Sequence, residues 1–194
     1  VGTHRRIAKK LGASSGSVPF LQVGDRVVAG SAAIIDWCEA QTTANPVSLQ
    51  GDDAGQVRAI EKRLDDIAGV HVRRFYYSDA LINAPKSVRP LFSNGLPLWQ
   101  RAAVTLAWSQ IVQLMVKVMD LGPEQGLESR AIVDRELAWL DDLLADGRPY
   151  LTGDHWTRAD LTAASLLAPL VVPEEHPVYT ALEVPQTLAS AIGL

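Results

Sequence analysis

Residues 18–37 read VPFLQVGDRVVAGSAAIIDW, and this stretch decides the predicted fold of the first part of the chain. Two runs rich in β-branched residues, 18–23 and 26–29, are separated only by a Gly-Asp pair. A two-residue connection of this kind predicts a β-hairpin. A serine then precedes the helical run 32–41, and residues 3–11 upstream predict another short helix. The expected order is therefore helix, hairpin, helix.

Val18 and Pro19 open the first predicted strand, although proline cannot donate a hydrogen bond to a sheet. The simplest interpretation is a proline at a strand start. The alternative is a cis peptide bond that leaves the Val18 backbone open to a ligand strand, and only about 5% of X-Pro bonds are cis. Ser31 after Gly30 also has two interpretations, either a helix N-cap or an anion site at a helix N-terminus.

The rest of the chain reads as helical. Apolar residues recur at three- and four-residue steps, and a loop is expected at 83–95, where two prolines and an Asn-Gly pair occur. Thr157 and Asp160 have the spacing of a capping box before a short segment that is apolar nearly all round, which predicts a helix buried on every side. The predicted helices are 57–77, 97–119, 133–144, 157–170 and 186–192.

The composition excludes several classes of protein. The 194 residues include 18 basic and 22 acidic side chains, for a net charge of −4, which argues against a nucleic-acid-binding surface. The single cysteine, Cys38, excludes an internal disulfide and is expected to be a buried, inert thiol. No membrane span or signal peptide is evident, so we expect a cytoplasmic protein with no membrane partner. His155 and His176 lack metal-ligand spacing, and we expect no metal site.

These motifs, in this order, resemble the glutathione transferase superfamily of the bacterial type. The stretches that carry the resemblance are SVPFLQVGDRVVAGSAAIIDW at 17–37 and LADGRPYLTGDHWTRADLTAASLLAPL at 144–170. The resemblance implies a two-domain α+β protein. An N-terminally incomplete thioredoxin-like α/β domain would occupy 1–41, a linker 42–54, and an all-α helical bundle domain 55–194.

The resemblance also implies a glutathione site. Val18, held by a cis Pro19, would pair its backbone with the cysteinyl part of glutathione, and Ser31 would bind the γ-glutamyl carboxylate. Many family members carry Glu, Gln or Asp where this chain has Gly30, so one polar contact is missing. The residue that stabilises the thiolate would lie before Val1, and the catalytic residue is therefore unknown.

An aromatic cluster near the end of the first long helix matches the place where the family has its apolar substrate site. His71, Phe75, Tyr76 and Tyr77 form this predicted pocket, although plain core packing would also explain such a cluster. The implied protein is a homodimeric transferase that conjugates its cosubstrate glutathione to a small electrophile. The alternative is a non-catalytic glutathione-transferase-like binding or interaction module.

Overall fold

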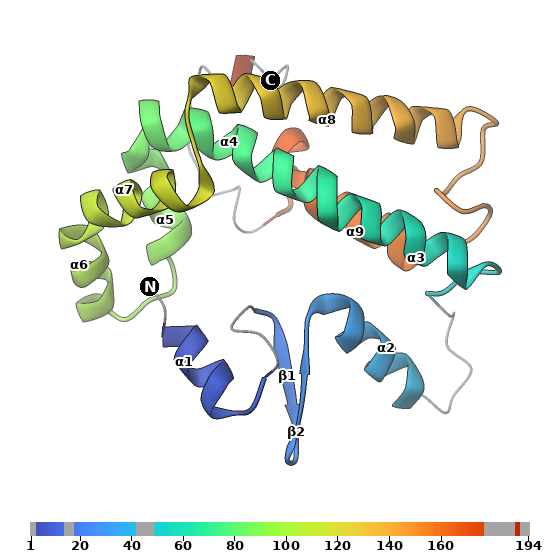
Figure 1. The fold of residues 1–194 in the computed structure, drawn as a ribbon, viewed down its shortest axis with the longest axis horizontal. Coiled ribbons are helices and arrows are strands. Elements are labelled where there is room, and N and C mark those ends of the chain that lie inside the picture. Colours follow the sequence, from blue (N-terminus) through green and yellow to red (C-terminus); the bar gives the residue numbers. More distant parts are fainter. Residues whose placement is uncertain (1–2, 14–17, 42–48, 177–188, 191–194) are drawn as a thin grey trace. The chain divides into compact units, whose positions relative to one another are not determined.

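The computed structural model describes residues 3–13, 18–41, 49–176 and 189–190. The chain divides into two compact units, Val1–Ser48 (unit 1) and Leu49–Leu194 (unit 2), which are drawn in Figure 1. Most of the expected linker lies outside the described residues, and so does the predicted last helix except for 189–190, which are helical.

Unit 1 contains a two-stranded antiparallel hairpin between two helices, so the predicted order is confirmed. Strands β1 and β2 pair in a register that sets Phe20 opposite Ala29, and the turn begins at Gly24, whose φ of +56° suits glycine. The peptide bond between Val18 and Pro19 is cis. The elements of unit 1 are α1 (Thr3–Lys10), β1 (Phe20–Val23), β2 (Arg26–Ala29) and α2 (Ser31–Gln41).

The described part of unit 1 has a small core. Its buried apolar residues are Ala8 and Val28, and helix α2 buries none of its side chains. The expectation that Cys38 is buried was wrong, because its side chain is exposed on α2. A two-stranded sheet offers too little apolar surface to cover a helix, which explains this exposure.

Unit 2 is all helical in its described part, and it begins with one long helical run. This run extends the predicted helix 57–77 in both directions and contains a π-helical turn, η1. The helices are α3 (Ala54–Arg63), η1 (Leu64–Ala68), α4 (Gly69–Asn83), α5 (Pro85–Ser93), α6 (Leu98–Leu106), α7 (Trp108–Met119), α8 (Pro123–Leu144) and α9 (Arg158–Val171).

Two predictions about the middle of unit 2 were wrong. The expected loop 83–95 contains helix α5, because Pro85 occupies the first turn, where its missing N–H costs nothing, and Val88 reaches the core. The expected single helix 97–119 is two helices, α6 and α7, bent by 65° at Ala107. Trp108 begins α7 buried, and its indole N–H donates to the Pro85 carbonyl at 2.8 Å, which anchors the bend.

Close helix packing in unit 2 depends on two glycines. At Gly69 a Cβ would lie 2.8 Å from Leu166 Cδ2, so α9 approaches α4 closely and a larger residue would require the Leu166 side chain to move. At Gly126 a Cβ would lie 3.0 Å from Ser78 Cβ, which allows α8 to run along α4. Figure 1 shows this pairing of α4 with α8.

Helix α9 begins as predicted but is not buried all round. The Thr157 N–H donates to Asp160 Oδ2 at 2.8 Å, which confirms the capping box. Burial is confined to the first turn, whereas Leu161 and Val171 are exposed, so the expectation of burial on every side was wrong. Helix α9 packs mainly on α3, η1 and α4. Its opposite face therefore remains exposed to solvent, even though its residues are largely apolar.

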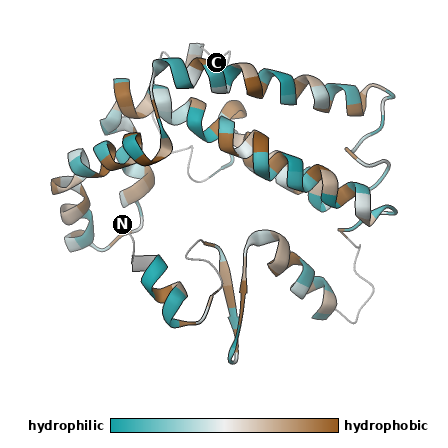
Figure 2. Cartoon of the chain, in the orientation of Figure 1, coloured by the Kyte–Doolittle hydropathy of each residue, from teal (hydrophilic) through white to brown (hydrophobic). Residues whose placement is uncertain are grey.

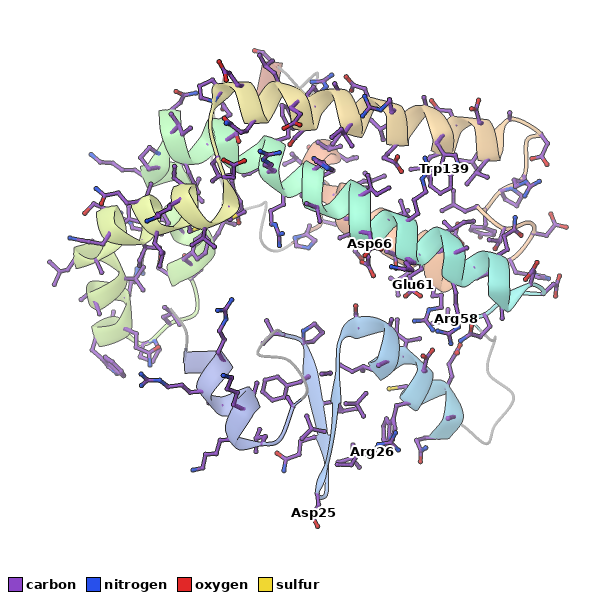
Figure 3. All side chains as sticks on the ribbon, viewed as in Figure 1. Asp25, Arg26, Arg58, Glu61, Asp66 and Trp139 are labelled. Carbon is purple, nitrogen blue, oxygen red and sulfur yellow. The ribbon has the colours of Figure 1, made fainter. Side chains whose placement is uncertain are left out.

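The core of unit 2 forms two clusters. One joins α4, α5 and α7 around Trp108, and the other joins α3, η1, α8 and α9 around Leu64. Beside the second cluster, the Arg63 guanidinium lies 3.8 Å from the centre of the Trp139 ring, which is labelled in Figure 3. The Arg63 side chain also donates a hydrogen bond to the Glu136 carboxylate. The helical scaffold is thereby tied together from α3 to α8.

Candidate functional site

The hairpin of unit 1 brings the two predicted glutathione-binding segments together. The register that pairs Phe20 with Ala29 continues by one step, and the Gly30 N–H donates to the Pro19 carbonyl at 2.9 Å. Val18 immediately precedes Pro19 in the chain and is 61% exposed. The cis peptide and the start of helix α2 are therefore neighbours at one end of the hairpin.

Ser31 is the first residue of helix α2 and is exposed. The helix starts with a hydrogen bond from the Ile34 N–H to the Gly30 carbonyl at 3.0 Å. A helix N-terminus attracts anions through its dipole and its backbone N–H groups. The Ser31 hydroxyl adds a donor beside that terminus, so this position suits a carboxylate.

Gly30 has a φ of +93°, in the left-handed region that L side chains rarely adopt. A Cβ there would meet no atom within 4 Å, so backbone conformation and not space favours glycine. The acidic or amide residue that the family resemblance leads one to expect here would be strained in this conformation.

Unit 2 contains a separate pocket of about 410 Å³ between α4, α5 and α9. Tyr76 and Tyr77 of the predicted substrate cluster line it, with their rings edge to face at 5.8 Å. The other lining residues are Gly69, Val72, Arg73, Leu91, Ser165, Leu166 and Pro169. Pockets with mostly apolar walls and a few polar groups are the usual form of small-molecule sites.

Arg73 is the charged residue of this pocket. Among the described residues no carboxylate pairs with its guanidinium, and the side chain is exposed. Burial raises the pKa of the Tyr77 hydroxyl, and the nearby Arg73 charge opposes that rise. The pocket therefore presents an apolar wall, a neutral phenol and one cation.

The other two members of the predicted cluster lie elsewhere on α4. His71 Nδ1 is 3.1 Å from the Ser129 hydroxyl on α8, and burial together with the Arg74 charge lowers its pKa. Phe75 lines a second pocket of about 280 Å³ between α4, α8 and α9, with the Arg130 guanidinium 5.5 Å from its ring centre. A helix turns 100° per residue, so this aromatic cluster is divided between opposite faces.

The sequence-based prediction missed Arg73 and the α5 and α9 residues of the first pocket. Gly69, Arg73 and Tyr77 are spaced by four residues, so helical periodicity alone would have placed them on one face. The contribution of α5 had no such signal, because that segment was expected to be a loop.

The part of the chain that the structure describes has no group of three or more His, Cys, Asp or Glu side chains arranged to hold a metal ion. Within the same residues, no single helix has the length and apolar content to cross a membrane, although α6 and α7 together meet that test as a bent pair.

A comparison with curated proteins gives two related matches. The chain is 29% identical to human glutathione S-transferase theta-2B over 155 residues, which is 77% of this chain and 49% of that protein. It is 28% identical to human glutathione S-transferase theta-2 over the same share of both chains.

The chain thus spans about half the length of the curated relatives it matches. No family model matches it, and no solved structure matches it significantly. Both relatives are human, so the bacterial type stays a prediction. The fold, a partial thioredoxin-like part followed by a helical part, agrees with these two matches, and together they support assignment of the chain to the glutathione transferase superfamily.

Proposed function

We propose that the chain is part of a glutathione transferase-like enzyme that conjugates the glutathione thiolate to a small electrophile. The observation that carries this proposal is the hydrogen bond between Gly30 and Pro19, which sets the exposed residue Val18 close to Ser31 at the start of α2. A peptide ligand could pair its backbone with Val18 while its carboxylate binds at Ser31. The two theta relatives support the same family of functions.

In this proposal Val18, Pro19, Gly30 and Ser31 bind glutathione, which is a cosubstrate. The electrophile occupies the pocket lined by Tyr76 and Tyr77. The protein is a cytoplasmic homodimer in the same proposal, as the family resemblance implies.

Glutathione affinity is expected to depend on Ser31. The Ser31→Ala change removes a hydroxyl donor to a carboxylate, and a hydrogen bond to a charged group contributes about 1.5–3 kcal/mol, so binding should weaken about tenfold or more. Isothermal titration of glutathione into the wild-type chain and the variant measures this. Ser31→Thr keeps the hydroxyl and should bind within about threefold of wild type, since only a methyl group is added.

The same experiment distinguishes the two functions that the sequence left open. Melting curves are needed in parallel, because a substitution in the first turn of α2 also changes the stability of the helix. Equal binding by wild type and folded Ser31→Ala would remove Ser31 from the site. No binding by the wild type at millimolar glutathione would favour the non-catalytic module.

Arg73 is expected to favour electrophiles that carry an anionic group. In the pocket of unit 2 its exposed guanidinium faces no described carboxylate, so an anionic substrate gains attraction there. For an exposed pair the gain is up to about 1 kcal/mol, so Arg73→Gln should raise KM for an anionic electrophile about two- to fivefold. A neutral electrophile of the same shape is the control, and a similar KM increase for both would contradict this role.

A further inference from the structure

Helix α6 presents an apolar face to solvent. Leu98 and Leu106 are each 84% exposed and Trp99 is 71% exposed, and the helix has no buried residue. At 100° per residue these three side chains share one arc with Ala102, opposite Val104, which packs on the core. Figure 2 colours much of α6 and of the adjoining α7 as hydrophobic. Contiguous exposed apolar surface of this kind marks an interaction site.

The charged residues of the segment that contains this face are all basic. Residues 80–119 contain two lysines and two arginines and no aspartate or glutamate, in a chain whose net charge is −4. Arg101 lies at the edge of the apolar arc on α6, and Lys117 lies on α7 beside the exposed Val118. An acid-free, cationic segment is complementary to an anionic surface.

We propose that α6, with the adjoining part of α7, docks on the surface of an anionic lipid bilayer. Leu98, Leu106 and Trp99 would enter the boundary between headgroups and acyl chains, and Arg101 and Lys117 would remain among the lipid phosphates. Tryptophan suits this position because its ring is apolar and its N–H is polar. The proposal concerns α6 and α7 only and does not depend on the proposed transferase activity. It replaces the expectation of no membrane partner.

The observations favour a lipid surface over a second copy of the chain. A symmetric contact through this face would bring together two cationic segments, with no carboxylate between 80 and 119 to compensate. A bilayer containing phosphatidylserine supplies the opposite charge and an apolar layer together.

Vesicle flotation of the purified chain tests this proposal. Wild type is expected to float with vesicles of phosphatidylcholine and phosphatidylserine at a 7:3 ratio, and binding should weaken in pure phosphatidylcholine and at high salt. Leu106→Glu should weaken binding at least about tenfold, because it removes a leucine from the buried face. Arg101→Gln should weaken it about fivefold, since one cation near the bilayer is lost.

A matched control lies on α8. Leu127 is 73% exposed, so Leu127→Glu makes the same chemical change and the same change of net charge outside α6. It should float like wild type. Failure of the wild type to bind, or an equal loss in Leu127→Glu, would overturn the proposal. So would light scattering that shows a wild-type dimer which Leu106→Glu converts to a monomer.

Discussion

Asp160→Ala is expected to lower the free energy of unfolding of unit 2 by about 3–5 kcal/mol, because three donors lose their acceptor in a buried site. Asp160 Oδ1 accepts the Leu151 N–H at 2.8 Å. Its Oδ2 accepts both the N–H and the hydroxyl of Thr157, each at 2.8 Å. One carboxylate therefore caps helix α9 and holds the preceding loop against it. Chemical denaturation followed by circular dichroism measures the change.

Two variants make the Asp160 result specific. Asp160→Asn keeps one acceptor oxygen and should recover part of the loss. Asp134 is exposed and pairs with Arg130 four residues earlier on α8, so Asp134→Ala should cost no more than about 0.5 kcal/mol. If the free energy of unfolding of Asp160→Ala falls by less than about 1 kcal/mol from the wild-type value, the capping role is refuted. The loss of a helix cap alone costs about that much.

Glu61→Leu is expected to have a similarly large effect, because it removes the carboxylate that pairs with a buried guanidinium. Arg158 Nη2 donates to Glu61 Oε1 at 2.9 Å, and the two side chains are 0% and 7% exposed. Figure 3 labels Glu61 on α3. Removing one partner of a buried pair costs about 3–5 kcal/mol. The free energy of unfolding from urea titration should fall by that amount.

Replacement of both partners gives the decisive comparison. Glu61→Leu with Arg158→Met removes both charges of the pair and should recover most of the stability lost by Glu61→Leu alone. Lys62 and Asp66 form a control pair one helical position away, at 76% and 59% exposure. Removal of that pair should cost no more than about 1 kcal/mol. Additive losses at Glu61 and Arg158 would show that the pair does not couple.

Both predictions concern the junction of α3 with α9, which supports the pocket of unit 2. The Arg158 N–H also donates to the Leu49 carbonyl at 2.9 Å, so the first turn of α9 is tied to the start of the unit. Further along, α9 contributes Ser165, Leu166 and Pro169 to the pocket. Loss of the cap or of the buried pair should therefore weaken ligand binding there through disorder of α9.

The local motifs were readable because their geometry depends on neighbours in the chain. The hairpin over 20–29 follows from a Gly-Asp turn between β-branched runs. The Thr157 and Asp160 capping box follows from a spacing of three residues. Helix α2 begins at Ser31 within the predicted segment, although Gly30, whose carbonyl accepts the first helical hydrogen bond, holds the N-cap position. Such features need few distant contacts, so sequence alone determined them.

Tertiary packing decided the rest. Residues 85–93 contain two prolines and read as loop, yet they form α5 because Val88, Leu91 and Phe92 find a core beside α4 and α7. The bend at Ala107 exists because buried Trp108 bonds to the distant Pro85 carbonyl.

The same packing divided the aromatic cluster of α4, with Tyr77 in one pocket and Phe75 in another. It also turned the apolar arc of α6 away from the core. Sequence determined which helices and turns this chain forms, because those depend on adjacent residues. Only the tertiary structure decided which face of each helix is buried, because burial depends on residues far apart in the chain.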